Sequence, residues 1–302
     1  MKNSQISEIT YAQNDTASLL APIFTHVSNT KGERDKDIVH YNYNGADITF
    51  RMFEKLDAIE QSVLLAIVGL SAKQGLLLPP EPKPGSISEK LLSQLNKGAS
   101  ELSPFSNHPR AIKTSYYGIL KASGMGRSKQ SKERLIEALK RLSQVNYEIE
   151  NVRYITSENM ISMVVDKTEE MLYIGISSIL SYAFENQYTY IDLIERKQLG
   201  SRAGIVHLLH ARLSASVNVG STHSFNAERM ALLLNGFVSR KKVNGEWVEI
   251  YEDIDSLKLK NLKRFVVSAF RKIGELEGWS ISEKGKGKSH VFKVSRLDIS
   301  NS

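Results

Sequence analysis

Two segments of the sequence are rich in lysine and arginine, the side chains that bind the phosphates and base edges of nucleic acids. Between Lys258 and Arg296, eleven basic residues accompany three acidic ones, and between Arg110 and Arg141 nine accompany two. The chain as a whole has 40 Lys and Arg against 33 Asp and Glu, a net charge of +7. Because the two segments carry +8 and +7, the remainder carries −8. Clustering of this kind indicates a polyanionic partner, and we expect double-stranded DNA.

The C-terminal basic segment has the apolar spacing of a long helix over 256–277, followed by a β-hairpin. A stripe that includes Phe265, Val266 and Ile273 is expected in the core, which leaves a face almost free of acids. Arg and Lys bind guanine edges, and Asn binds adenine edges. We therefore assign base contacts to Lys260, Asn261, Arg264 and Ser268. Phosphate contacts are assigned to Lys258, Lys263, Arg271 and the hairpin lysines Lys284, Lys286 and Lys288.

The N-terminal basic segment has a similar helix over 128–142, but acids interrupt its outward face. Glu133 and Glu137 would repel phosphates, so this segment is ranked below the other for base contact. The DNA-binding residues expected here are Arg127, Lys129 and Lys132, which would contact the backbone, and Arg134. The second segment should therefore dominate the affinity.

Motifs that support catalysis or cofactor binding are incomplete. The segment Gly285–Ser289 ends like a phosphate loop, but Ser282 stands where the first glycine is required, and two strands flank it. His207 and His210 lie one helical turn apart among apolar residues, which favours packed or surface histidines over metal ligands. The chain has no cysteine, which excludes disulfides and Cys-ligated metals. We expect no enzymatic activity, no cofactor and no metal.

The elements that must position the basic residues form two similar groups. At an offset of 131, Ala138–Leu142 aligns with Ala269–Ile273, and each basic helix leads into a short strand. Asn44-Gly45 predicts a hairpin over 38–53, and 56–74 has the spacing of an apolar helix. Each half has two helices, a basic helix and a hairpin in this order. This order predicts an α+β fold, mainly α, with two tandem winged-helix domains. The expected divisions are a flexible N-terminal arm (1–17), a first domain (18–176) and a second domain (177–302).

The composition resembles that of soluble globular proteins, with 41% apolar and 24% charged residues. The sequence contains no apolar run near 18 residues and no secretory signal at its start. We therefore expect no membrane association and a location in the bacterial cytoplasm.

Several sequence blocks in a fixed order resemble the iteron-binding replication initiators of IncQ-type plasmids, the replication protein C family. The blocks are Leu19-Leu-Ala-Pro-Ile-Phe24, Tyr43-x-Gly45-x-x-Ile48-x-Phe50, Gly75-Leu-Leu-Leu-Pro-Pro-Glu-Pro-Lys83, Leu208-Leu-His-x-Arg-Leu213 and Glu275-Leu-Glu-Gly-Trp-Ser-Ile281. The resemblance implies tandem winged helices, binding to direct repeats at an origin, melting of adjacent AT-rich DNA, and recruitment of a plasmid-encoded helicase and primase. The chain departs from it in the longer stretch Ser239–Asp255 and in Leu257, Leu259 and Leu262.

Two other functions remain open from the sequence. A winged-helix transcription repressor would bind a palindromic operator as a dimer, and neither a homodimer nor an array on DNA conflicts with the residues. A plasmid primase or nicking enzyme would require a metal or nucleotide site, and the sequence offers no complete motif for one.

Overall fold

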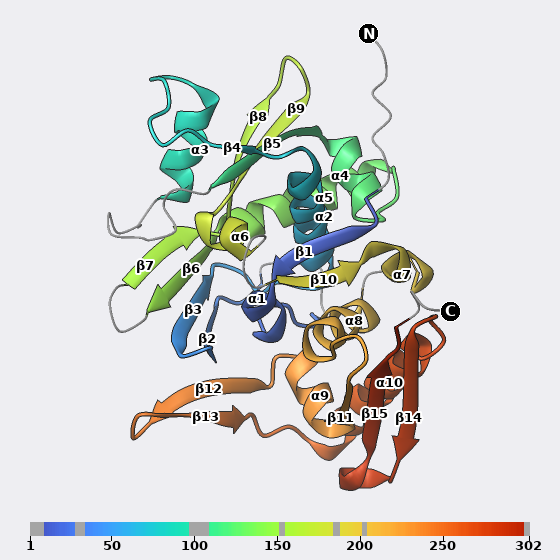
Figure 1. Cartoon of the computed structure of the whole chain (residues 1–302). Helices are drawn as coiled ribbons and strands as arrows, with labels where there is room; N and C mark the ends of the chain where they lie inside the picture. Colours follow the sequence, from blue (N-terminus) through green and yellow to red (C-terminus); the bar gives the residue numbers. More distant parts are fainter. Residues whose placement is uncertain are drawn as a thin grey trace.

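A computed structural model describes residues 9–27, 34–96, 109–150, 155–183, 188–200 and 204–298 (Figure 1). The helices are α1 (Thr16–Leu20), α2 (Ala58–Gln74), α3 (Ile87–Leu95), α4 (Tyr116–Ala122), α5 (Lys129–Ser143), α6 (Ser178–Ala183), α7 (Leu193–Gln198), α8 (Ile205–Ser216), α9 (Ala227–Leu234) and α10 (Ser256–Ile273), with a 3-10 turn η1 (Gly287–Ser289). The strands are β1 (Tyr11–Asp15), β2 (Asp37–Tyr43), β3 (Ala46–Met52), β4 (Leu76–Leu77), β5 (Arg110–Ser115), β6 (Val145–Glu150), β7 (Ile155–Asn159), β8 (Ile161–Asp166), β9 (Met171–Ile176), β10 (Tyr188–Asp192), β11 (Thr222–Asn226), β12 (Val238–Val243), β13 (Glu246–Tyr251), β14 (Trp279–Lys284) and β15 (Val291–Arg296).

The expectation of a mainly α fold is wrong. About 40% of the structure is helix and about 34% is strand, and the strands of the described residues form five sheets with antiparallel pairing. Two sheets have four strands each, in the orders β2-β3-β6-β7 and β4-β5-β9-β8. Short strands such as β4 and the mostly exposed β11 lack the apolar alternation that marks a strand in sequence. The chain is therefore α+β with substantial sheet content, and the tandem winged-helix architecture is not confirmed.

Helix α2 forms the centre of the molecule, as its apolar sequence predicts. Almost every residue from Ala58 to Ser71 is buried, and the helix contacts β1, α4, α5, β5 and α8. Its start is fixed by a capping box, in which Asp57 accepts a hydrogen bond from the backbone of Ile59 and Glu60 accepts one from the backbone of Asp57. A helix that is apolar on all sides must be enclosed, and here both halves of the chain enclose it.

The predicted hairpin around Asn44-Gly45 is confirmed as β2 and β3. Both turn residues have positive φ, 51° and 80°, which matches the right-handed twist of the two strands. On the inner face of this sheet Phe50 stacks on Tyr147 with ring centroids 4.5 Å apart. The sheet therefore joins the hairpin to β6, the strand that follows α5.

Part of the expected N-terminal arm is built into the fold. Residues 11–15 form β1, which pairs along its length with β10, and Thr16 begins α1. Asp15 caps α1 and also accepts a hydrogen bond from the Tyr147 hydroxyl at 2.9 Å. Residues 1–8 lie outside the described part, and the division between domains at residues 176 and 177 stays a prediction.

The two halves share an order of elements. The first half has α2, β5, α4, α5 and the hairpin β8–β9, with β4 and α3 inserted before β5 and with β6 and β7 inserted after α5. Its strands are ordered β5-β9-β8. The second has α8, β11, α9, α10 and the hairpin β14–β15, with β12 and β13 inserted between α9 and α10. Its strands are ordered β11-β15-β14. Helices α5 and α10, which carry the two basic segments, hold the same position in this order. The similarity seen at an offset of 131 thus corresponds to a shared topology.

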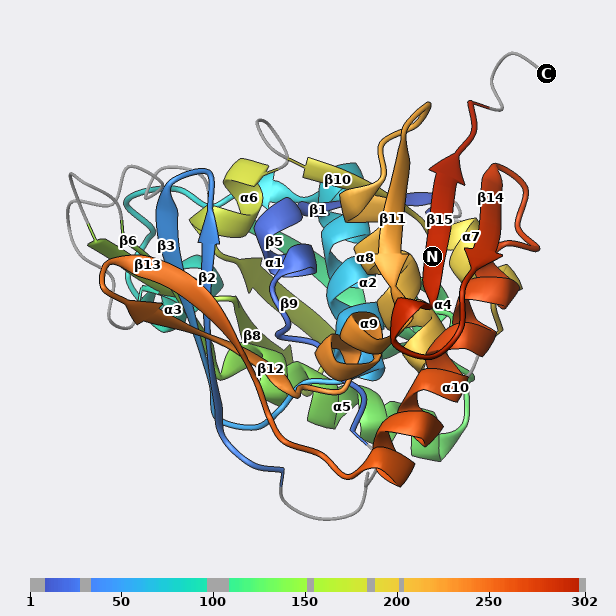
Figure 2. The ribbon, with the colours of Figure 1, turned by 90° about the horizontal axis from the view of Figure 1, so that it is seen from below.

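The hairpin β12–β13 reaches from the second half to the first (Figure 2). Asn244-Gly245 forms its turn with positive φ at both residues, the same signal as in β2–β3. Strand β12 contacts β2, and Asp47 accepts hydrogen bonds from the indole of Trp247 at 2.7 Å and from Lys242 at 3.0 Å. The long stretch 239–255 that distinguishes the sequence therefore forms a clasp between the halves.

Among the described residues, no helix is both long enough and apolar enough to span a lipid bilayer.

Candidate nucleic-acid interface

Helix α10 carries most of the predicted DNA contacts. Asp255 caps its start by accepting a hydrogen bond from the backbone of Lys258 at 2.9 Å. Its buried side holds Val266, Ala269, Phe270 and Ile273, and the Phe270 ring stacks on Phe292 of β15 with centroids 4.2 Å apart. This packing fixes the helix against the three-stranded sheet and leaves the opposite side in solvent.

The structure brings the predicted base-contacting residues together on that solvent side. The exposed side chains of the α10 set are Lys258, Lys260, Asn261, Arg264, Ser268 and Arg271. Phe265 was expected in the core stripe but is 50% exposed, because the buried stripe is narrower than the apolar pattern. Its ring lies 5.6 Å from the Arg264 guanidinium carbon, beside the basic face.

The hairpin β14–β15 places three more lysines next to α10. Its strands pair from Trp279 with Arg296 to Lys284 with Val291, and the turn η1 joins them. Gly285 and Gly287 have φ of 78° and 62°, which glycine adopts without strain. The lysines at the tip are exposed: Lys284, Lys286 and Lys288. The predicted hairpin and its basic tip are therefore confirmed as structure, and their contact with DNA stays a prediction.

Lys263 links the helix to the hairpin tip. Its ammonium donates a hydrogen bond to the Gly287 carbonyl at 2.5 Å and lies 3.5 Å from a Glu228 carboxylate oxygen. A groove of about 460 Å³ opens beside this contact, between α10, the start of α9 and the tip. Its walls include Lys260, Arg264, Leu259, Val267 and Lys288. The helix and the hairpin tip therefore act as one basic surface.

Arg271 is partly neutralised in the free protein. It forms a two-pronged ion pair with Glu283 at 3.0–3.1 Å, and His290 lies 2.8 Å from the same carboxylate. Burial raises the pKa of Glu283, but hydrogen bonds from Arg271 and His290 outweigh this effect and hold the pKa below its ordinary value. Neither this ion pair nor that of Lys263 with Glu228 is evident from the sequence, because the paired residues are distant along the chain. The cations of this set without a carboxylate partner among the described residues are Lys258, Lys260, Arg264, Lys284, Lys286 and Lys288.

The first basic segment presents its charges beside two tyrosines. The Arg127 guanidinium lies 4.4 Å from the centre of the Tyr117 ring, and the Lys132 ammonium lies 4.8 Å from that of Tyr116. Lys129 and Arg134 are exposed as well. These four predicted residues therefore gather around the start of α5 and the start of α4.

The hairpin next to α5 differs in charge from the one next to α10. The turn between β8 and β9 carries Asp166, Glu169 and Glu170 around a single lysine, and Glu169 pairs with Lys113 at 2.7 Å. The equivalent turn in the second half carries lysines and no acid between Lys284 and Lys288. The halves share a topology, but only the second combines a basic helix face with a basic hairpin tip.

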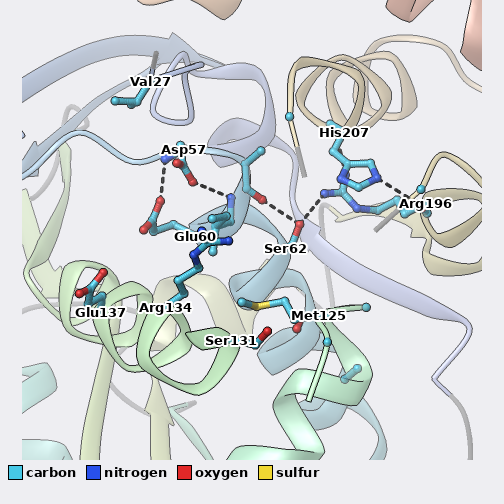
Figure 3. A pocket seen from close by; sticks show the side chains of 18 of the residues that line it. Val27, Asp57, Glu60, Ser62, Met125, Ser131, Arg134, Glu137, Arg196 and His207 are labelled. Atoms are coloured by element: carbon cyan, nitrogen blue, oxygen red, sulfur yellow. Dashed lines mark hydrogen bonds between the residues drawn. The ribbon is translucent and has the colours of Figure 1, made fainter. Parts of the chain in front are cut away.

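Arg141 and Arg134 have roles that the sequence did not predict. Arg141 pairs with Glu54 at 2.7 Å and with Glu60 at 3.1 Å, and it lies 3.9 Å from Glu137 one turn earlier on the same helix. Arg134 lines a cavity of about 710 Å³ between the start of α2, the turn from α4 to α5, and α7 with the start of α8 (Figure 3). Both arginines and carboxylates line this cavity, which residues of the two halves enclose.

The two histidines of α8 are packed groups, as expected. His207 bonds the Arg196 carbonyl at 3.0 Å, and His210 bonds Glu195 at 2.7 Å. Burial, with the charge of Arg196, lowers the pKa of His207 to about 3, so this ring is neutral at physiological pH. Within the described ranges, no group of three or more His, Cys, Asp and Glu side chains is placed to hold a metal ion.

A family model matches most of the chain. The family model described as Replication protein C (RepC) matches residues 6–296. No curated protein matches the sequence significantly.

Crystal structures of RctB domains 2 and 3 are similar in fold to this chain. A selenomethionine derivative is 10% identical with a TM-score of 0.49, and the match covers 93% of this chain and 98% of that one. A second structure of these domains is 10% identical with a TM-score of 0.48, covering 90% and 94%.

Proposed function

Because the chain belongs to the Replication protein C (RepC) family, we propose that it initiates plasmid DNA replication by binding direct repeats, or iterons, at the origin. The observation that carries this proposal is the basic surface formed by α10 and the tip of β14–β15. Its unpaired cations stand on a helix that is free to enter a major groove and on a hairpin beside it. The resemblance to IncQ-type initiators supports the same function.

In this proposal α10 contacts the bases and the tip of β14–β15 contacts the phosphates. Lys260, Asn261, Arg264 and Ser268 project from α10 toward base edges, where Arg and Lys distinguish guanine and Asn distinguishes adenine. The tip lysines bind phosphates beside the groove and set the position of the helix without selecting sequence. The contact of Lys263 with Gly287 keeps the helix and the tip in a fixed relation.

The first half adds contacts of a different kind. Arg127, Lys129 and Lys132 stand at the start of α5, where they reach the DNA backbone, and Arg134 lies on the same helix. The acidic turn between β8 and β9 weakens this half as a phosphate-binding surface. The second half therefore supplies most of the affinity and specificity.

Origin opening follows from crowding several copies on adjacent repeats. An array or dimer of this kind bends and strains the duplex, and the strain favours opening of an AT-rich neighbour. The opened strands then receive a plasmid-encoded helicase and primase. In this scheme the protein acts by binding, without a cofactor, a metal or a catalytic step of its own.

Footprinting on origin DNA tests the proposal. A duplex with direct repeats, a duplex with one palindromic pair, and a scrambled duplex are compared, with permanganate probing of the adjacent AT-rich segment. We expect protection of each direct repeat and reactive thymines in the AT-rich segment. Protection of the palindrome alone would favour a repressor instead. Equal binding to all three duplexes would contradict sequence-specific initiation.

A further inference from the structure

Leu257 is an exposed apolar side chain in the first turn of α10. It is 66% exposed, whereas Leu259 and Leu262 of the same helix are half-buried against the core. Single exposed leucines are common on protein surfaces, so exposure alone assigns it no role. Its position relative to the polar residues of α10 is what distinguishes it.

Leu257 shares a face of α10 with the residues assigned to base contact. The spacing from Leu257 to Asn261, Arg264 and Ser268 is four, seven and eleven residues, which places all four side chains on one stripe of the helix. The buried residues Val266 and Phe270 lie on the opposite side. A helix that presents Asn261 and Arg264 to base edges therefore presents Leu257 to base edges too.

The apolar character of Leu257 favours the floor of the groove over the DNA backbone. An apolar side chain is a poor partner for phosphate. In the major groove, the apolar group on a base edge is the C5-methyl of thymine.

We propose that Leu257 recognises a thymine methyl group and is a specificity-determining residue of this DNA interface. The inference rests on the proposed function, since it requires α10 to enter the major groove. The branched methyls of leucine and the thymine methyl exclude water from each other when they meet. Loss of one such methyl corresponds to about a 4-fold loss of affinity, taking about 0.8 kcal/mol for a buried methyl-sized group.

Replacing thymine by deoxyuracil tests the inference, because uracil keeps the hydrogen-bonding edges and lacks the methyl. Duplexes carrying one direct repeat of the plasmid origin, with deoxyuracil at each thymine position in turn, are titrated with the full chain. The variants are Leu257→Ala and, as a matched control, Leu76→Ala, which removes a leucine 76% exposed on β4 at the opposite end of the molecule (Figure 1). Thermal unfolding of each variant confirms its fold.

We expect the unmodified protein and Leu76→Ala to lose about 4-fold in affinity at one or two thymine positions. Leu257→Ala should bind the all-thymine repeat more weakly and respond little to deoxyuracil at those positions. If the unmodified protein binds the repeat but every deoxyuracil duplex equally well, the inference is overturned and the proposed function stands. If the protein does not prefer the repeat over scrambled DNA, the proposed function itself fails.

Discussion

Two lysines of the hairpin β14–β15 allow a test of whether phosphate binding depends on position or on total charge. Lys286 lies at the tip, beside the groove along α10. Lys293 is exposed on β15 of the same hairpin, but its neighbours Phe292 and Val294 point into the core against α10. Because side chains alternate along a strand, Lys293 projects from the face of the sheet opposite to the helices. Alanine at either position removes one charge from the same hairpin.

Counterion release sets the size of the expected difference. Each phosphate neutralised by a lysine contributes about 0.9 to the slope of log affinity against log salt concentration. Lys286→Ala should therefore reduce the slope by about 0.9, so its deficit relative to the unmodified protein changes about 3.5-fold between 50 and 200 mM salt. The same deficit is expected on repeat and random duplexes, because phosphate contacts do not select sequence. Lys293→Ala should leave the slope nearly unchanged.

Fluorescence anisotropy titrations at four salt concentrations provide the slopes for both variants and for the unmodified protein. Equal slopes for Lys286→Ala and Lys293→Ala would refute the assignment, because total charge and not position would then govern binding. A Lys286→Ala deficit confined to the repeat duplex would also refute it, since that pattern belongs to base contact.

Three further predictions concern other parts of the structure. Arg264→Ala should weaken the binding free energy for the repeat by about 1–3 kcal/mol and relax the sequence preference. Competition binding against random DNA measures both effects. An equal loss of affinity on repeat and random duplexes would contradict base contact. Asp47→Ala removes the acceptor of the Trp247 indole. In a Trp279→Phe background, where Trp247 is the one remaining tryptophan, this change should shift the fluorescence to longer wavelength. An unchanged spectrum would contradict the clasp between the halves. Burial raises the pKa of Glu249, but hydrogen bonds from neighbouring arginine and tyrosine side chains outweigh this effect and lower the pKa to about 2. Its contribution to stability is present above pH 4.5 and is lost as the pH falls toward 2, so the gap in melting temperature between the unmodified protein and Glu249→Gln should narrow over that range. A gap independent of pH would count against this role.

The sequence predicted elements whose signals are local. Helix α2 was identifiable from its apolar run and the hairpin β2–β3 from Asn44-Gly45, because both depend on neighbouring residues. The same Asn-Gly signal at Asn244 marks the turn of β12–β13. Strands such as β5 were missed because their pairing is with partners far along the chain. The mainly α expectation failed for this reason.

The candidate interface was predicted in outline and corrected in detail. Helical spacing was enough to place Arg264 and Asn261 on an exposed face, because α10 is amphipathic. It could not show that Phe265 lies outside the core, since the width of a buried stripe depends on what packs against it. Nor could it show that Glu228 and Glu283 partly neutralise Lys263 and Arg271, because these pairs form only when separate elements come together.

The chain has no cysteine, so a single introduced thiol can carry a DNA-cleaving reagent to one known place. Iron–EDTA attached to Ser289→Cys at the hairpin tip is compared with the same reagent attached to Ser93→Cys, an exposed position on α3 in the first half. With both conjugates bound to the same direct repeats, the structure predicts strand cleavage beside each repeat from Ser289→Cys and none above background from Ser93→Cys. Cleavage from Ser93→Cys with none from Ser289→Cys would contradict the placement of DNA against α10 and the hairpin tip.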